Sequence, residues 1–372
     1  MNVLTVIGTR PEAIKMAPVI KELRRHGGSI VSRVCVSAQH RRMLDQVLEL
    51  FELKPDYDLD IMQEDQTLTY VTARVLTELH DVIVDFRPDW MLVQGDTTTT
   101  MAASLAAYYH RVRIGHVEAG LRTGDKFRPY PEEVNRRMAD VLSDAHFVPT
   151  ERAKQNLLRE AVAPASIFLT GNTVVDALLD ISARPFDFRG TPLERLAEDP
   201  RRIILVTAHR RENFGAPLDE LCSALRHIAE RYASTVQIVY PVHPNPNVRG
   251  PVHQQLDGLS NVRLVDPLDY VSLVHLMKRA FLILTDSGGV QEEAPSLGKP
   301  VLVLRDMTER PEAVEAGAAR IVGMKRSSIV EGTIRLLDHR DEYERMARIV
   351  NPYGDGKASQ RIVATLLQDG RP

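Results

Sequence analysis

The stretch Thr285-Asp286-Ser287-Gly288-Gly289-Val290-Gln291-Glu292-Glu293-Ala294 indicates a strand that turns directly into a helix. The apolar run Phe281–Leu284 before it is typical of a short buried strand, and helical character continues over Val290–Leu297. Such a junction presents bare backbone N–H groups and the positive end of a helix dipole, and two glycines let an anion approach closely. A nucleotide phosphate would suit this turn. Strand-to-helix turns of this spacing also occur without any ligand, so the spacing leaves both interpretations open.

The two acids of this helix start admit two explanations as well. Glu292 and Glu293 favour the first turn of a helix through the dipole alone. A carboxylate one turn past a phosphate site can also accept hydrogen bonds from ribose hydroxyls.

Composition indicates an ordinary soluble protein of two domains. The chain has 372 residues, 44% of them hydrophobic and 26% charged, with a net charge of −3. This balance gives no reason to expect nucleic acid or a membrane as a partner. Cys35 and Cys222 lie far apart within apolar runs, which favours a reducing cytoplasm. We expect no signal peptide, because the chain enters a strand at once, and no metal, because HExxH and CxxC patterns are absent.

Short Val/Ile/Leu-rich runs alternate with amphipathic segments along the whole chain, which predicts an α/β protein with two successive parallel sheets. The predicted strands are Val3–Ile7, Val31–Val36, Met91–Gln94, Arg113–Val117, His146–Val148, Ile167–Leu169, Ile203–Val206, Val236–Tyr240, Val262–Val265, Phe281–Leu284 and Val301–Leu304. The predicted helices include Arg41–Phe51, Thr67–Phe86, Thr100–Tyr109 and Glu132–Leu142. We place the domain boundary near Gly171, in Gly171-Asn172-Thr173.

Ligands of doubly wound sheets bind beyond the carboxyl ends of the strands, so the residues that follow each strand are the candidate site. The first strand is followed by Gly8-Thr9-Arg10-Pro11-Glu12-Ala13-Ile14-Lys15, which lacks the GxGxxG pattern of dinucleotide binding. Arg10 and Lys15 could reach an anion, or could be solvated charges. Asp96 follows Gly95 and precedes four threonines, where it could act chemically or simply help to cap a helix.

Three further strand ends carry ionisable groups. Glu118 follows a strand directly, a position that is harder to explain as plain surface. Glu132 opens a helix after a proline, where pairing with an arginine four residues on is the competing explanation. His209 stands at a strand end beside two arginines, which favours a function, and His243 is a weaker case of the same kind.

Taken together, these segments resemble the non-hydrolysing UDP-N-acetylglucosamine 2-epimerases of bacteria. The resemblance runs in order from Met1 to about Leu367, and the hydrolysing animal relatives carry a sugar-kinase domain for which this chain is too short. The segments that carry it are GTRPEAIKMAP (8–18), QHRRMLDQVL (39–48), GDTTTT (95–100), GHVEAGLRTGD (115–125), PEEVNRR (131–137), HRRENFG (209–215), PVHPNPNVR (241–249), DSGGVQEEAPSLGKPVLVLRD (286–306) and NPYGDGKAS (351–359).

The resemblance implies a GT-B-like fold of two Rossmann-like domains that face a central cleft. The expected boundaries are 1–171 with the returning helix at 355–372, and 172–354 for the UDP-binding domain; Lys357–Gln368 fits the returning helix. UDP would contact the second domain, with Glu293 as the ribose-binding acid. The implied substrate and UDP ligands are Arg10, Lys15, His209, His243, Leu268, Leu273, Ser287, Gly288, Gly289, Glu293 and Arg310. Leu268 and Leu273 are not diagnostic residue types, and they leave the contacts to the base undefined.

The resemblance also implies the proton-transfer residues Asp96, Glu118 and Glu132, together with His209. It implies a homodimer that serves cell-surface polysaccharide synthesis. It further implies activation by substrate at a second site, which would involve Gln39, His40, Gln46, Arg74 and Arg210. These five could equally be ordinary polar surface residues.

Chemistry supports the same hypothesis independently of the family. The hydrogen on carbon 2 of an N-acetylglucosaminyl ring is not next to a carbonyl, so a side chain cannot remove it directly. Loss of UDP from carbon 1 creates oxocarbenium character that acidifies this C–H, and a carboxylate can then form a 2-acetamidoglucal. Such a route needs cations on the leaving diphosphate and acids around the sugar, and no cofactor. The sequence does not distinguish base from acid among the three carboxylates.

Two other functions are compatible with the pattern. A GT-B-type glycosyltransferase, or a hydrolytic epimerase, would use the same nucleotide turn but would transfer or release the sugar. A non-catalytic nucleotide-sugar sensor would bind without turnover and would not need three acids.

Overall fold

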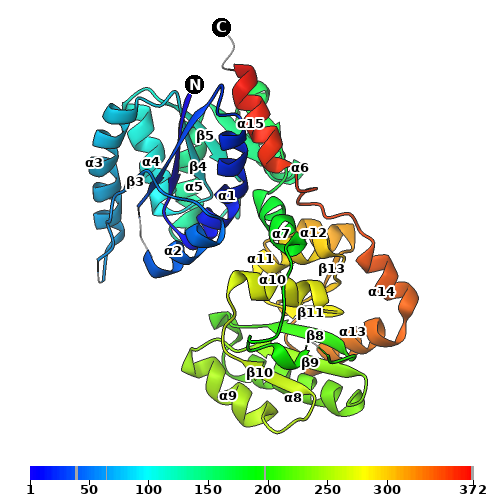
Figure 1. The fold of residues 1–372 in the computed structure, drawn as a ribbon. Helices are drawn as coiled ribbons and strands as arrows, with labels where there is room; N and C mark the ends of the chain where they lie inside the picture. The colour runs from blue at the N-terminus through cyan, green and yellow to red at the C-terminus, as the bar shows by residue number, and fades with distance from the viewer. Residues whose placement is uncertain (38–40, 64, 197, 370–372) are drawn as a thin grey trace. The chain divides into compact units, whose positions relative to one another are not determined.

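The computed structural model describes residues 1–37, 41–63, 65–196 and 198–369, with the backbone alone at 41–43 and 369. The chain divides into two compact units (Figure 1). Unit 1 comprises Met1–Ala177 and Tyr353–Pro372, and unit 2 comprises Leu178–Pro352. The sequence-based boundaries for the functional domains, at 171/172 and 354/355, stay predictions.

Unit 1 is built on a sheet of seven parallel strands in the order β3-β2-β1-β4-β5-β6-β7. The strands are β1 (Asn2–Ile7), β2 (Val31–Val36), β3 (Tyr57–Asp58), β4 (Trp90–Gln94), β5 (Arg113–Val117), β6 (Ala145–Val148) and β7 (Ile167–Leu169). Its helices are α1 (Arg10–Arg25), α2 (Arg41–Leu50), α3 (Leu68–Phe86), α4 (Thr98–Tyr109), α5 (Glu132–Leu142), α6 (Glu151–Arg159), α7 (Thr173–Ala183), which runs on into unit 2, and α15 (Ala358–Asp369).

Unit 2 has a second parallel sheet of six strands in the order β10-β9-β8-β11-β12-β13. The strands are β8 (Arg202–Thr207), β9 (Val236–Pro241), β10 (Val262–Val265), β11 (Leu282–Thr285), β12 (Val301–Val303) and β13 (Ala319–Ile321). Its helices are α8 (Ala216–Arg231), α9 (Pro246–Leu256), α10 (Tyr270–Arg279), α11 (Gly288–Glu293), α12 (Pro311–Ala316), α13 (Arg326–Asp338) and α14 (Arg340–Ala347). The expected fold class is therefore confirmed: both units are Rossmann-like.

Each sheet is covered by apolar helix faces, as alternating strands and helices require. In unit 1, α3 and α4 pack on the buried side chains Leu4, Val6, Met91 and Val93. In unit 2, α8, α9 and α13 cover the buried faces of β8, β9 and β11. The returning helix α15 packs beside α1 within unit 1 (Figure 1), so the last segment of the chain completes the first unit.

Side-chain caps start several of these helices where the sequence places Thr, Asn or Asp. Thr97 accepts the backbone N–H of Thr100 at 3.1 Å at the start of α4, so the capping role considered for this turn is confirmed for Thr97. Asp269 accepts the N–H of Ser272 at 2.9 Å and caps α10. These caps fix the ends of strands and helices from which the candidate site is built.

Most of the predicted bounds differ from the structure by one or two residues, one predicted helix has another form, and two edge strands were not predicted. The predicted helix Val290–Leu297 is the short α11 followed by a 3₁₀ turn, Ala294–Leu297, because Pro295 cannot donate a helical hydrogen bond. The edge strands β3 and β13 were missed: they have only two and three residues, too few to show a periodic pattern.

Candidate functional site

The strand order of unit 1 reverses between β1 and β4, which is the topological switch point where parallel sheets bind ligands. Two predicted loops meet there. Arg10 is the first residue of α1 and is half-buried, and Asp96 lies in the turn between β4 and α4. Glu12 joins these loops: its buried carboxylate accepts the N–H of Gly8 at 3.1 Å and the hydroxyl of Thr97 at 2.8 Å. Burial raises the pKa of Glu12 above its usual value.

Glu118 has an unusual backbone and a fully hydrogen-bonded carboxylate. Its φ of +66° lies in the left-handed region, which is costly for a residue with a side chain and is typical of functional sites. Its N–H donates to the carbonyl of Phe147 at 3.0 Å. The ammonium of Lys15 contacts both oxygens at 2.7 and 2.6 Å, and Asn172 donates to Oε1 at 3.1 Å. Gln94 is a further donor to Oε2, so the carboxylate has the contacts of an ionised group.

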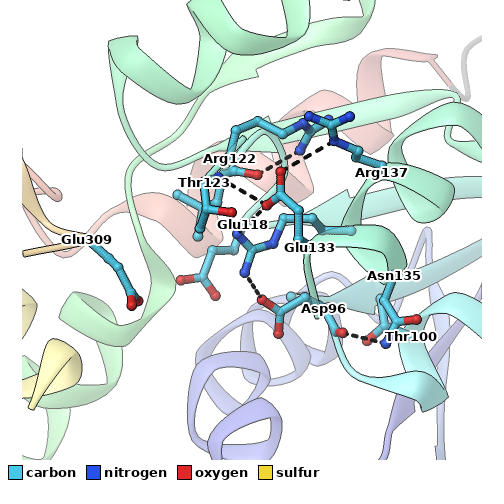
Figure 2. A network of polar contacts seen from close by, with 12 residues as sticks. Asp96, Thr100, Glu118, Arg122, Thr123, Glu133, Asn135, Arg137 and Glu309 are labelled. Atoms are coloured by element: carbon cyan, nitrogen blue, oxygen red, sulfur yellow. Dashed lines mark hydrogen bonds and ion pairs between the residues drawn. The ribbon is translucent and has the colours of Figure 1, made fainter. Parts of the chain in front are cut away.

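Asp96 lies beside Glu118 and is held by an arginine of α5. A methyl group on Gly95, the residue before it, would lie 3.9 Å from Oε2 of Glu118. Arg136 contacts the Asp96 carboxylate at 2.5 Å and Glu133 at 3.2 Å, and Asn135 donates to the Asp96 carbonyl at 3.0 Å. Figure 2 shows Asp96, Asn135 and Glu133 within this network.

The acids at the start of α5 have different surroundings. Glu133 is fully buried and accepts the N–H groups of Thr123 and Gly124 at 3.0 and 3.2 Å, so it fixes the loop that leads from Glu118 to α5 (Figure 2). Glu133 also pairs with Arg137 at 3.3 Å, an i,i+4 contact. Glu132 instead has a buried Oε2 without a hydrogen-bond partner among the described residues. A buried, unpaired acceptor is unusual and fits a group whose partner is a ligand.

The switch point of unit 2 lies between β8 and β11, and Asp286 organises it. Asp286 is fully buried. One of its oxygens accepts the N–H groups of His209 and Arg210 at 2.9 and 2.8 Å and the amide of Asn213 at 3.0 Å. The imidazole of His209 lies 3.6 Å from the other oxygen and stacks on His243, with ring centroids 5.4 Å apart. Burial lowers the pKa of His209, although Asp286 opposes the shift.

Two guanidinium groups converge on the predicted phosphate turn. A methyl group on Gly288 would lie 3.9 Å from Nη2 of Arg210 and 4.0 Å from Cζ of Arg310. Ser287 is the N-cap residue of α11, and Gly289 lies exposed in its first turn. Positive charge beside a glycine turn is suited to a diphosphate.

The remaining predicted ligands of unit 2 lie around α10 and α11. The hydroxyl of Tyr270 donates to Oε1 of Glu293 at 2.7 Å and orients this buried carboxylate. Leu268 precedes the cap of α10 and Leu273 lies on α10, both half-buried. His243 is exposed after β9.

The structure describes only part of the predicted second site, at which substrate would activate the enzyme. Gln39 and His40 lie outside the described residues. Gln46 is exposed on α2, and Arg74 pairs with Glu78 on α3 at 3.1 Å. Arg210 lies beside Gly288, at the phosphate turn.

Sequence reasoning missed several residues that build the site. Gln94 and Asn172 contact Glu118, and Tyr270 contacts Glu293, although none of them stands in a recognisable motif. Only their position in the sequence could have indicated Gln94 and Asn172, because Gln94 is the last residue of β4 and Asn172 comes shortly after β7.

In the part of the chain that the structure describes, no three His, Cys, Asp or Glu side chains are grouped as metal ligands would be. Nor does that part contain a helix with the length and hydropathy of a membrane span.

Comparison with known proteins gives consistent results. A family model described as UDP-N-acetylglucosamine 2-epimerase matches residues 21–367. The chain is 56% identical over 371 residues to the UDP-N-acetylglucosamine 2-epimerase of Yersinia pestis, covering 98% of each chain. It is also similar to the crystal structure of the Neisseria meningitidis UDP-GlcNAc 2-epimerase bound to UDP-GlcNAc, with 51% identity and a TM-score of 0.88 over 99% of this chain and 100% of that one. The glycotransferase of kitacinnamycin, at 12% identity and a TM-score of 0.68 over 100% and 99% of the chains, shares the fold alone.

Proposed function

The chain belongs to the UDP-N-acetylglucosamine 2-epimerase family, and on that premise we propose that it interconverts UDP-N-acetylglucosamine and UDP-N-acetylmannosamine without releasing free sugar. The observation that carries the proposal is the Glu118 carboxylate, held in a left-handed turn at the switch point of unit 1 by Lys15, Gln94 and Asn172. A carboxylate fixed in this way is suited to take a proton repeatedly from one position.

The proposed reaction starts at the nucleotide. The C1–O bond breaks and the electron pair leaves with UDP, whose diphosphate would be stabilised by Arg210 and Arg310 beside Gly288. The sugar then has oxocarbenium character, and a carboxylate removes the proton from carbon 2 to give 2-acetamidoglucal. Protonation of carbon 2 from the opposite face and return of UDP to carbon 1 give the epimer. The substrate's atoms and charge balance, because one group takes a proton and another delivers one, and proton exchange with water then resets both groups.

The proposed roles follow the geometry of each group. Glu118, with the contacts of an ionised carboxylate, acts as a base, and Asp96 and Glu132 are the candidates for the second proton transfer. His209 serves the diphosphate side, and Glu293 binds the ribose with its orientation set by Tyr270.

One experiment tests the reaction. The purified protein is incubated with UDP-N-acetylglucosamine in heavy water, without NAD or added metal, and followed by proton NMR. The proposal expects UDP-N-acetylmannosamine with deuterium at carbon 2. Inversion with the original hydrogen retained would exclude the elimination route. Free sugar would indicate a hydrolytic epimerase, transfer to an acceptor a glycosyltransferase, and tight binding without turnover a sensor.

We further propose that the enzyme is a cytoplasmic homodimer that supplies an N-acetylmannosaminyl donor for surface polysaccharide synthesis and is activated by its own substrate. Both cysteines are free and buried, which suits a reducing compartment. Initial rates at increasing UDP-N-acetylglucosamine test the activation: the proposal expects a sigmoidal curve, and a hyperbolic curve would contradict it.

A further inference from the structure

The side chain of His116 makes two hydrogen bonds that require both ring nitrogens to donate. His116 lies on β5 with a fully buried side chain. Its Nε2 is 2.7 Å from the carbonyl oxygen of Gly95, which can only accept. Its Nδ1 is 2.6 Å from a carboxylate oxygen of Asp140 on α5. An imidazole with an acceptor on each nitrogen is the doubly protonated, cationic form.

Neighbouring ionised side chains compensate the positive charge of this imidazolium. The second oxygen of Asp140 contacts Arg122 at 2.7 Å, and Arg122 contacts Glu160 at 2.7 Å. Burial alone would lower the pKa of His116, but Asp140 raises it above the usual value. Burial would likewise raise the pKa of Asp140, but His116 and Arg122 hold it below the usual value. We call these four residues the His116 chain; its charges alternate in sign.

The His116 chain ends on the turn that carries Asp96. Gly95 has a left-handed φ of +74°, and its N–H donates to the carbonyl of Val117 at 3.0 Å. The imidazolium holds the carbonyl of the same residue, so both backbone groups of Gly95 are fixed to β5. A rotation of this carbonyl would move the next residue, Asp96, relative to Glu118.

We propose that His116 is a positioning residue for the reaction: as an imidazolium it holds the Gly95 carbonyl and thereby sets Asp96 against Glu118. This rests on the proposed function. The ring of His116 hydrogen-bonds to Asp140 and to the Gly95 carbonyl, and its effect reaches the sugar through the turn. Displacement of a reacting group by about 1 Å can cost on the order of 100-fold in rate.

His146 provides a matched control. It is the register neighbour of His116 on β6 and is equally enclosed, and its Nε2 lies 2.8 Å from the backbone carbonyl of Asp140. Its Nε2 contacts the carbonyl of Asp140 and its Nδ1 lies near both the hydroxyl and the carbonyl of Ser166, and neither residue belongs to the Gly95 turn. His146→Gln therefore perturbs the same core and the same helix without touching that turn.

The test compares His116→Gln, Asp140→Asn and His146→Gln in the full-length enzyme. For each, kcat, KM and UDP affinity are measured at a temperature where circular dichroism shows the protein folded. We expect His116→Gln to lower kcat by at least about tenfold, with KM and the Kd for UDP within about threefold of wild type. His146→Gln should keep kcat within about threefold. If His116→Gln does not fold, Asp140→Asn, which keeps the side-chain volume, carries the same expectation of reduced kcat.

Three outcomes would overturn the inference. One is a wild-type kcat in folded His116→Gln or Asp140→Asn. Another is an equal loss in His146→Gln, which would indicate a general packing effect. The third is a ring spectrum of His116 by ¹⁵N NMR at neutral pH with a single protonated nitrogen, since the inference expects two. An inactive wild-type enzyme would instead contradict the proposed function, so the two failures are distinguishable.

Discussion

Glu118 illustrates how a single side chain is specialised by its position. It combines a left-handed backbone with three side chains that donate to its carboxylate, Lys15, Gln94 and Asn172. A residue in a sparsely populated conformation persists only where its surroundings fix it. The sequence located Glu118 correctly at a strand end, but nothing in the sequence indicated the positive φ. That conformation depends on the carbonyl of Phe147 on the neighbouring strand.

The first prediction concerns the charge of this carboxylate. Glu118→Gln should lower kcat by at least about 100-fold, because an amide cannot accept the carbon-2 proton. The Kd for UDP, measured by calorimetry, should stay within about threefold, because most of the predicted nucleotide ligands lie in unit 2. Glu49→Gln, an exposed acid on α2, is the control and should be fully active. Normal turnover in Glu118→Gln would remove the residue from the mechanism.

The second prediction concerns recognition of the ribose by Glu293. Glu293→Ala should raise the Kd for UDP by roughly tenfold, because a charged hydrogen-bond acceptor is lost. A double cycle with 2′-deoxy-UDP identifies the contact: if Glu293 binds the 2′-hydroxyl, the loss on substitution should be much smaller for the deoxy ligand. Unchanged affinity for UDP in Glu293→Ala would show that the ribose assignment is wrong.

At the scale of elements, the strands were predicted more accurately than the contacts between them. β2, β5, β7 and β10 have their predicted bounds, because each is a short run rich in Val, Ile or Leu. The contacts that build the site, such as His116 with Gly95 or Asn172 with Glu118, join residues distant in sequence. These contacts follow from the order of the strands in the sheet, which the periodicity of apolar residues along the sequence does not reveal. Similarly, the family resemblance named the acids of the site and Lys15, but not Gln94, Asn172 or Tyr270, which also contact those acids.

The third prediction concerns how α15 is attached to unit 1. Asp176 on α7 accepts the N–H groups of Ala358 and Ser359 at 3.2 and 2.8 Å and the Ser359 hydroxyl at 2.6 Å, so it caps α15. Asp176→Ala should reduce the free energy of unfolding by about 1–3 kcal/mol, because buried donors lose their acceptor. Asp180→Ala, on the exposed side of the same helix, should cost clearly less. Urea denaturation of both variants measures the difference, and equal losses would contradict the capping role.

At the scale of the whole molecule, the His116 chain predicts how stability depends on pH. The pKa of His116 is raised in the folded state. Protonated His116 therefore contributes its full stabilisation of the fold below about pH 6.5, and this stabilisation is lost as the pH rises through the pKa of the folded protein. The stability gap between wild type and His116→Gln should therefore be larger at pH 6 than at pH 9. Denaturation of both proteins at these pH values measures it. A gap that widens toward alkaline pH would show that the imidazole is neutral in the folded protein.

The last prediction concerns the proposed dimer and an apolar stripe that α5 exposes. Val134, Met138 and Val141 recur at helical spacing and are 38%, 39% and 82% exposed, and Tyr108 and Tyr109 on the neighbouring α4 are 58% and 68% exposed. Apolar side chains clustered in this way are typical of a surface that another protein chain covers. We expect this face to be buried between two copies of the chain.

Met138→Glu combined with Val141→Glu should then convert the protein to a monomer, because two carboxylates would be buried without partners. Light scattering coupled to size exclusion measures the change, from about twice the chain mass of 41.8 kDa to the chain mass itself. Val350→Glu is the control, since Val350 is 83% exposed but belongs to unit 2 and not to the unit that contains α5. A monomeric wild type, or a double variant that stays dimeric, would contradict this use of the stripe. Monomer formation by Val350→Glu would place the contact in unit 2 instead.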